Sequence, residues 1–256
     1  MNCQIRKRSD MVTMEADKAK KTTEQDVADI LEHHIALLRY LNNLAHRMRT
    51  PLTVMKSYSE LVLAGIYGSV EGEIEDKIRY IDHAMDELST MVDQMEDFRE
   101  IQDMEVEAVS ERIDVVGLVE KTSYELGMEY DVENDLEIRS QREEMVCFLN
   151  PHRTQRALSH LIRLAMDRTK GPVKIELLKE YGRLVVRILG DIGPVNIGEV
   201  DTMVDRITAE NDHVGEEEWR SFTLFLARSF MRMQGGDVKV VDTGGDKAFE
   251  LSMLCG

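Results

Sequence analysis

Cysteine and long apolar runs are scarce in this sequence, and each scarcity excludes a class of protein. Three cysteines, Cys3, Cys147 and Cys255, are too few and too scattered for a disulfide framework or a thiolate metal site. No apolar run approaches the roughly 18 residues of a membrane span, and residues 1–21 lack the apolar core of a signal peptide. We therefore expect no membrane association and a cytoplasmic location.

Basic residues are also in deficit. The 256 residues include 32 Lys and Arg against 49 Asp and Glu, a formal net charge of -17. Phosphate backbones are bound by basic faces, so this balance argues against a nucleic-acid partner and favours protein partners with basic patches. A hydrophobic content of 43% is that of an ordinary folded protein with one large domain or two modest ones.

The first hundred residues predict a helical hairpin. Residues 1–24 are polar and form an expected mobile lead-in. A helix is predicted from about residue 25 to residue 64, and Gly65, Gly68 and Gly72 then mark a turn. A second helix is predicted over residues 73–103, so that residues 25–105 form one helical domain.

Apolar residues recur along both helices at intervals of three, four and seven, which is typical of helices that pack side by side. Two such helices cannot bury both stripes well alone, so we expect a homodimer with a four-helix bundle. The alternative is a coiled coil within one chain, covered by the remaining residues. The stripes consist of Ile30, Leu37, Leu41, Leu44, Met48, Leu52, Met55 and Val62, and of Ile74, Ile78, Ile81, Met85, Leu88, Val92, Met95 and Phe98.

His46 lies off this stripe, in the segment LAHRMRTPL. It is two residues from both Leu44 and Met48, so its ring should face solvent, with Asn43, Arg49 and Thr50 on the same face. Two interpretations stand on spacing alone. The histidine is either a solvated surface residue or a nucleophile that carries a covalent group.

Residues 110–256 change to short alternating elements, which predict an α+β two-layer sandwich. Strands are expected over 112–116, 136–140, 145–149, 173–179, 184–189, 238–241 and 249–253, with Cys147 packed in its strand as a small apolar residue. Helices are expected over 117–130, 153–169, 200–207 and 216–233.

The segment LAHRMRTPLTVMKSYSELV resembles the phosphoacceptor motif of two-component sensor histidine kinases, usually His-Glu-Leu-Arg-Thr-Pro-Leu. The residues His46, Arg49, Thr50, Pro51 and Leu52 match it. The resemblance extends from about residue 30 to the end, because residues 110–256 follow the element order of the family's Bergerat-like ATPase domain. It implies that His46 is phosphorylated.

This sequence departs from the family at the position after the histidine. The family has an acidic residue there, which acts as a base, whereas this chain has Arg47. A guanidinium cannot accept a proton at cellular pH. Arg47 and Arg49 can instead offset phosphoryl charge.

The nucleotide motifs depart further. The family's Asn-Leu-x-x-Asn-Ala becomes a sequence with His160 and Leu164 in place of the asparagines, and leucine offers no oxygen to magnesium. In Asp-x-Gly-x-Gly the residues Asp191 and Gly193 remain as a remnant nucleotide motif, but Val195 replaces the second glycine. Asp191 has a second interpretation, an ordinary turn. The glycine-rich stretch is replaced by SFTLFL, residues 221–226.

These features predict a dimeric histidine phosphotransferase that exchanges a phosphoryl group between His46 and receiver-domain aspartates of response regulators. Such a protein binds no cofactor tightly and has no metal site of its own, because the receiver domain supplies magnesium. Partner choice is expected at residues 56–63 and 78–85. Two alternatives remain, an ATP-dependent kinase with divergent motifs and a pseudo-kinase scaffold that only binds regulators; Thr50 would position water in a phosphatase variant.

Overall fold

The computed structural model describes residues 41, 43–102, 109–129, 136–180, 182–193, 216–244 and 247–254. The chain divides into two compact units, Met1–Gln102 and Asp103–Gly256. The expected lead-in, the start of the first helix and the helix expected over 200–207 lie outside the described residues. Each unit is described separately below.

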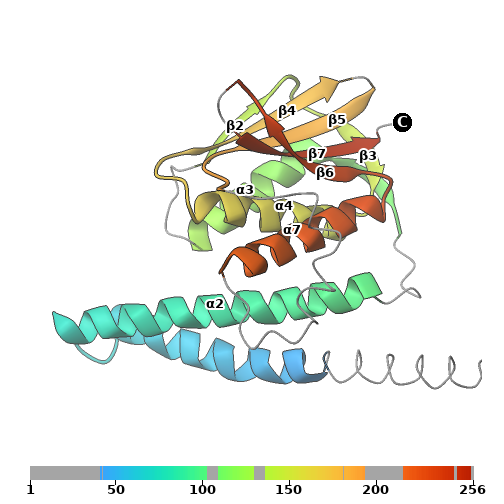
Figure 1. Cartoon of the computed structure of the whole chain (residues 1–256). Coiled ribbons are helices and arrows are strands. Elements are labelled where there is room, and N and C mark those ends of the chain that lie inside the picture. Colours follow the sequence, from blue (N-terminus) through green and yellow to red (C-terminus); the bar gives the residue numbers. More distant parts are fainter. Residues whose placement is uncertain are drawn as a thin grey trace, which may run out of the picture. The chain divides into compact units, whose positions relative to one another are not determined.

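The first unit is a helical hairpin, as the sequence predicts (Figure 1). Its first helix covers residues 43–63, and α2 covers Glu73–Gln102. Gly65, Gly68 and Gly72 in the turn have φ values of 73°, 112° and 66°. Only glycine adopts such values without steric cost, so these residues allow the chain to reverse.

The apolar stripes do not all meet inside the hairpin. Ala45, Leu52 and Val92 form the buried core of the hairpin, with exposed fractions of 0%, 5% and 1%. In contrast, Ile81 and Leu88 remain 54% and 41% exposed, so the prediction that the second helix presents one stripe to the first is wrong at these positions. Met85 and Val92 of the same helix are 4% and 1% exposed, and heptad spacing alone does not show which of these two pairs faces the first helix.

The second unit contains a five-stranded sheet in the order β2-β4-β5-β7-β6 and a separate antiparallel pair, β1-β3. Among the described strands, β2 and β4 pair in parallel and the other neighbours are antiparallel. The expected strands all form, within a few residues of their predicted ends. Their bounds are Glu111–Asp114 for β1, Leu136–Ser140 for β2, Val146–Leu149 for β3, Val173–Glu180 for β4, Arg183–Leu189 for β5, Asp237–Asp242 for β6 and Lys247–Leu254 for β7.

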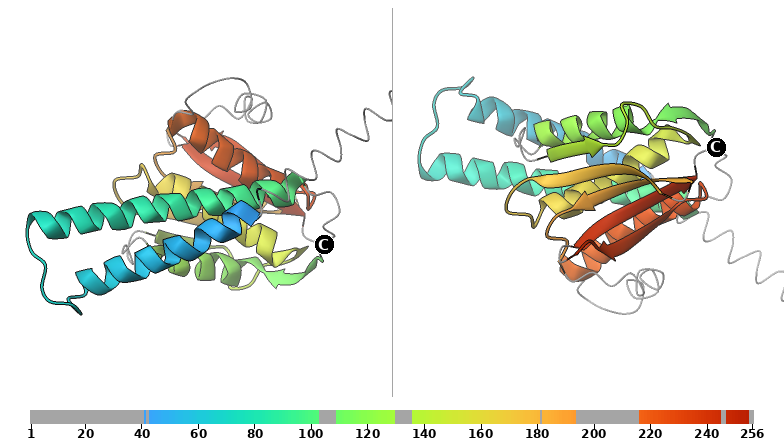
Figure 2. Two further views of the ribbon diagram at one scale, coloured as in Figure 1. Left: turned by 90° about the horizontal axis from the view of Figure 1, so that it is seen from below. Right: turned by 90° about the horizontal axis from the view of Figure 1, so that it is seen from above.

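Three helices, α3 (Val115–Glu129), α4 (Pro151–Met166) and α7 (Glu216–Arg232), lie on one face of this sheet (Figures 1 and 2). Alternate strand residues such as Ile175, Val186 and Leu251 are fully buried on that face. Among the described residues no helix covers the other face. The unit is therefore a two-layer α+β sandwich with one open sheet face.

Local hydrogen bonds determine where the helices begin. The carboxylate of Asp114 accepts from the amides of Val116 and Gly117 at 3.2 and 3.1 Å. This cap starts α3 two residues earlier than predicted. The side chain of Asn150 accepts from the amide of Arg153 at 2.9 Å, and Pro151 occupies the first turn of α4.

Candidate functional site

His46 is exposed on the first helix, as predicted. Its neighbour Ala45 is fully buried and Leu52 nearly so, and both face α2. Because successive helical residues are rotated by about 100°, the imidazole projects away from the interior of the hairpin. Thr50 is also exposed, one helical turn after His46. The histidine is thus accessible to a partner protein.

The side chain of Arg49 points toward α2 and not to the exposed face of His46, contrary to the expectation from helical spacing. Its guanidinium bonds Asp93 at 2.5 Å and Glu96 at 2.9 and 3.0 Å, both on α2. The hydrogen bond to Glu96, together with the one to Asp93, raises the pKa of Arg49 and outweighs the opposing effect of burial. We call Arg49, Asp93 and Glu96 the Arg49 cluster. The positive charge of Arg49 is therefore already neutralised within the hairpin.

Arg47 differs from Arg49 in this respect. It is exposed, and it has no ion pair among the residues the structure describes. Of the two arginines expected to offset phosphoryl charge, Arg47 is therefore the one whose charge is not already engaged.

A second polar cluster joins the helices nearer the turn. Lys56 bonds Asp82 and Asp86, each at 2.7 Å, and the Ser59 hydroxyl donates to Asp82. Burial alone would lower the pKa of Lys56, but the hydrogen bonds to the two carboxylates outweigh it and raise that pKa. We call Lys56, Ser59, Asp82 and Asp86 the Lys56 cluster.

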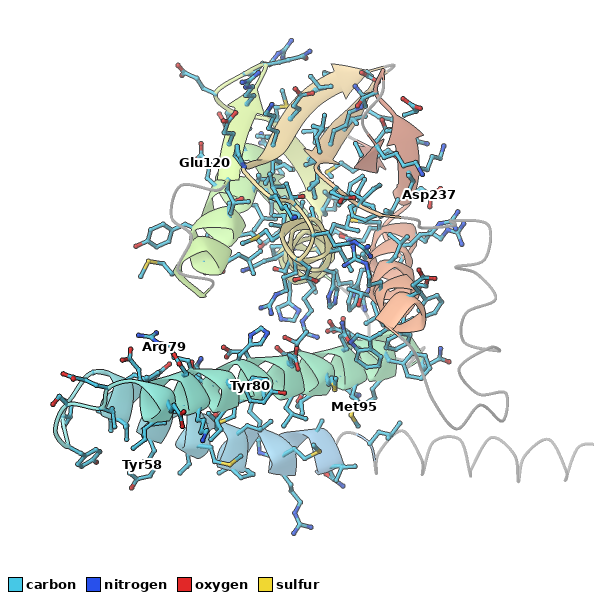
Figure 3. The ribbon with its side chains drawn as sticks, turned by 60° about the vertical axis from the view of Figure 1, so that its left-hand side comes forward. Tyr58, Arg79, Tyr80, Met95, Glu120 and Asp237 are labelled. Atoms are coloured by element: carbon cyan, nitrogen blue, oxygen red, sulfur yellow. The ribbon has the colours of Figure 1, made fainter. Side chains whose placement is uncertain are left out.

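The Lys56 ammonium therefore bonds carboxylates of its own hairpin. Lys56 is the first residue of the range 56–63, which was predicted to determine the choice of partner. The same ranges also contain exposed apolar and aromatic side chains. Tyr58 is 58% exposed and Tyr80 is 76% exposed. In Figure 3 the Tyr58 ring points away from α2.

The position where the family binds magnesium is apolar in this chain. Leu164 is 3% exposed in the core side of α4, and His160 is 6% exposed. Arg220 of α7 donates to the backbone carbonyl of Leu164 at 2.9 Å and lies 3.7 Å from Asp167. A buried guanidinium thus bridges α4 and α7 beside Leu164. No motif in the sequence predicted this contact.

The SFTLFL segment is helical throughout. Residues 221–226 lie inside α7, with Leu224 and Leu226 fully buried and Thr223 5% exposed. A helix has no free backbone amides in its interior, because each amide is bonded within the helix. This segment therefore forms no phosphate-binding loop.

Asp191 and Gly193 form a local turn. The Asp191 carboxylate accepts from the Gly193 amide at 3.1 Å, and Gly193 has a φ of 64°. The Asp191 amide donates to the Thr169 hydroxyl at 2.9 Å, and the guanidinium of Arg168 lies close to Gly193. This geometry is that of an ordinary turn, and the role of Asp191 and Gly193 as a remnant nucleotide motif stays a prediction. Val195, the third residue of the motif, lies outside the described residues.

Two further expectations concern metals and cysteine. Among the described residues, no group of three His, Cys, Asp or Glu side chains is arranged to hold a metal ion. Cys147 is 2% exposed in β3 and is disulfide-bonded, which the spacing of three cysteines did not predict.

No helix in the described part of the chain is long and apolar enough to cross a membrane.

Comparisons with known proteins identify the helical hairpin and the fold. Residues 36–103 match the His Kinase A (phospho-acceptor) domain family. No curated protein matches the sequence.

Two solved structures share the fold. The histidine kinase AdeS of Acinetobacter baumannii is similar over 82% of this chain and 98% of its own, with a TM-score of 0.51 and 14% identity. Full-length ShkA, solved in complex with AMPPNP, is similar over 85% of this chain and 46% of its own, with a TM-score of 0.58 and 19% identity.

Proposed function

Because the chain carries the phosphoacceptor domain of the two-component histidine kinase family, we propose that it is a histidine phosphotransferase. In this proposal His46 exchanges a phosphoryl group with the aspartate of a response-regulator receiver domain. The observation that carries it is the contrast between the two units. The helix that bears His46 keeps an accessible imidazole, whereas two positions of the family's nucleotide motifs are occupied by the buried Leu164 and the helical residues 221–226.

The reaction needs no general base next to the histidine. In a neutral imidazole one ring nitrogen has a free lone pair, and this nitrogen attacks the phosphorus of the receiver's phosphoaspartate. The N–P bond forms as the bond from phosphorus to the aspartate oxygen breaks, and the aspartate leaves as a carboxylate. The receiver domain supplies the magnesium that balances the phosphoryl charge. Arg47 replaces the family's acidic residue without removing a group that this transfer requires.

We also propose that the protein acts as a homodimer. Ile74, Ile81 and Leu88 recur every seven residues along α2 and are 60%, 54% and 41% exposed, and Met55 on the first helix is 47% exposed. A row of this kind is the seam through which helices associate. A second hairpin would cover it and complete a four-helix bundle.

Transfer from a phosphorylated receiver domain tests the function. The receiver, labelled on its aspartate, is mixed with the wild-type protein in the absence of ATP, and we expect acid-labile label to appear on the protein. His46→Ala should abolish this label. His83→Ala is the matched control, because His83 is an exposed histidine of the same hairpin, and it should be labelled like the wild type.

Each other outcome contradicts the proposal. Label on His46 that requires ATP and magnesium, with none transferred from the receiver, would establish a kinase. Receiver binding without label on any variant would establish a scaffold.

A further inference from the structure

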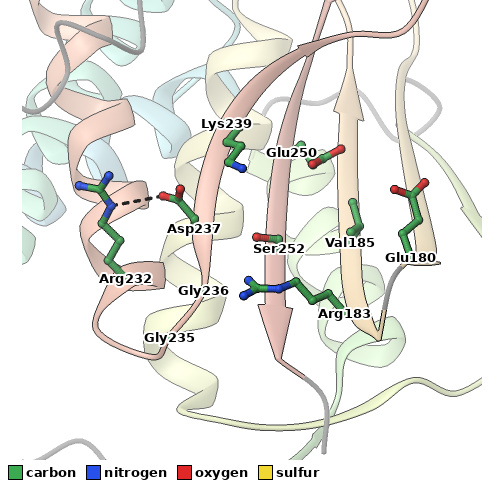
Figure 4. A pocket seen from close by; sticks show the side chains of 10 residues that line it. All are labelled: Glu180, Arg183, Val185, Arg232, Gly235, Gly236, Asp237, Lys239, Glu250 and Ser252. Carbon is green, nitrogen blue, oxygen red and sulfur yellow. Dashed lines mark hydrogen bonds and ion pairs between the residues drawn. The ribbon is translucent and has the colours of Figure 1, made fainter.

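The open face of the sheet carries a hollow that the proposed function does not use. It has a volume of about 460 Å³ and lies over β4, β5, β7 and β6, beside the turn that follows α7 (Figure 4). Cavities of 300–1,000 Å³ are typical of small-molecule sites. The hollow lies on the sheet face opposite to the one that packs against α4 and α7.

The acidic residues of the hollow are all paired with arginines. Glu180 and Glu250 bond Arg187 at 2.9 and 2.8 Å. Burial alone would lower the pKa of Arg187, but the hydrogen bond to Glu250 and the charges of both carboxylates raise it. Asp237 bonds Arg228 at 3.0 Å and Arg232 at 3.3 Å. None of the three carboxylates is therefore left to bind a cation.

Two cations of the hollow have no such partner. The side chains of Arg183 and Lys239 make no ion pair or hydrogen bond among the described residues. In Figure 4 their side chains extend toward Ser252 from opposite sides. Two unpaired positive groups around one hydroxyl are unexpected in a chain with a net charge of -17. They create a local positive potential where the surrounding acids are already neutralised.

The backbone fixes one wall of the hollow. Gly235 has a φ of 75°, and a Cβ on Gly236 would lie only 2.6 Å from the carbonyl oxygen of Ser252. The two glycines therefore hold the start of β6 tightly against β7, and a side chain at Gly236 would force these strands apart. The backbone next to Ser252 is therefore closely packed, which favours a preorganised wall.

We propose that this hollow binds a small molecule that bears an oxyanion, either a phosphate or a carboxylate. Arg183 would donate two parallel hydrogen bonds to the oxyanion, Lys239 would act as a point charge, and the Ser252 hydroxyl would complete the site. The site is independent of His46 and of the nucleotide remnant. Its existence does not depend on the proposed phosphotransfer.

Isothermal titration of the full chain with pyrophosphate and, separately, with succinate tests this proposal. We expect saturable binding of at least one probe, and the probe that binds identifies the anion class. Arg183→Gln combined with Lys239→Gln should weaken that binding at least tenfold. The matched control is Lys174→Gln, which removes an exposed lysine from β4 outside the hollow and should bind like the wild type.

Thermal unfolding midpoints of all variants confirm that they fold. The proposal is overturned if neither probe shows saturable binding. It is equally overturned if the double variant binds as tightly as the wild type, or if Lys174→Gln weakens binding to the same extent.

Discussion

His46 and Arg49 lie three residues apart on one helix, but their side chains have different surroundings. His46 faces solvent, and the guanidinium of Arg49 reaches Asp93 and Glu96 on α2. A sequence motif gives the order of residue types, but it does not show which neighbour each side chain contacts. At this scale, Arg49 supports the position of the helix that presents the histidine, and His46 is the group open to chemistry.

Asp82 has a lowered pKa in the folded hairpin, so its ionisation links stability to pH. Burial alone would raise the pKa of Asp82, but hydrogen bonds from Lys56 and Ser59 outweigh it and lower the pKa below its ordinary value of 3.8. A carboxyl with a lowered pKa in the folded state contributes stability that is complete above the unfolded pKa. That contribution is lost as the pH falls through the lowered, folded-state pKa.

We therefore predict that Asp82→Asn lowers the free energy of unfolding by about 1–2 kcal/mol at neutral pH. The difference from the wild type should shrink as the pH falls below about 4, because the carboxyl of the unfolded chain is then protonated and, at still lower pH, that of the folded chain as well. Urea unfolding followed by circular dichroism at several pH values measures it. Glu60→Gln, which alters an exposed carboxyl on the first helix, should change stability little at any pH. A difference for Asp82→Asn that is independent of pH would contradict this account.

At the scale of elements, a buried arginine joins α4 and α7. Arg220 is 7% exposed, and it bonds the Leu164 carbonyl across the two helices. The helical form of residues 221–226 and the buried guanidinium are therefore parts of one packed interface.

We predict that Arg220→Met lowers the free energy of unfolding by about 1–3 kcal/mol, because the buried hydrogen bonds of the guanidinium are lost. The fluorescence of Trp219, the chain's single tryptophan, reports on this end of α7 during urea unfolding. Ser221→Ala is the control, since its hydroxyl bonds only Glu217 of its own helix. The prediction fails if Arg220→Met loses no more stability than Ser221→Ala.

The sequence predicted those elements whose signals are local. Gly65, Gly68 and Gly72 ended the first helix as expected, and alternating apolar residues placed all seven strands. It missed contacts between distant residues, such as Arg220 with Leu164, because side-chain partners are set by packing. The start of α3 was also missed, since Asp114 gave no recognised capping signal. Of the candidate site, the exposure of His46 was predictable from helical spacing, whereas the pairing of Arg49 was not.

At the scale of the whole molecule, the exposed heptad row on α2 leads to a prediction about assembly. If a second hairpin covers this row, then charges placed in it should separate the subunits, because charged groups resist burial in an apolar seam. We predict that Ile81→Glu with Leu88→Glu converts a dimer to a monomer in size-exclusion chromatography with light scattering.

The control places the same two charges outside the row, at Thr53 and His83, which are both exposed. Thr53→Glu with His83→Glu should remain dimeric. A monomeric wild-type protein, or a dimer that survives the Ile81 and Leu88 substitutions, would contradict the proposed assembly.

The Arg49 and Lys56 clusters have one more consequence, which concerns alignment. Ion pairs in partly exposed positions add little to stability, but they form only when particular residues face each other. The two clusters lie about two helical turns apart on the first helix. Together they fix the register of this helix against α2. A substitution in either cluster can therefore leave the protein folded and still shift the position of His46 along the hairpin.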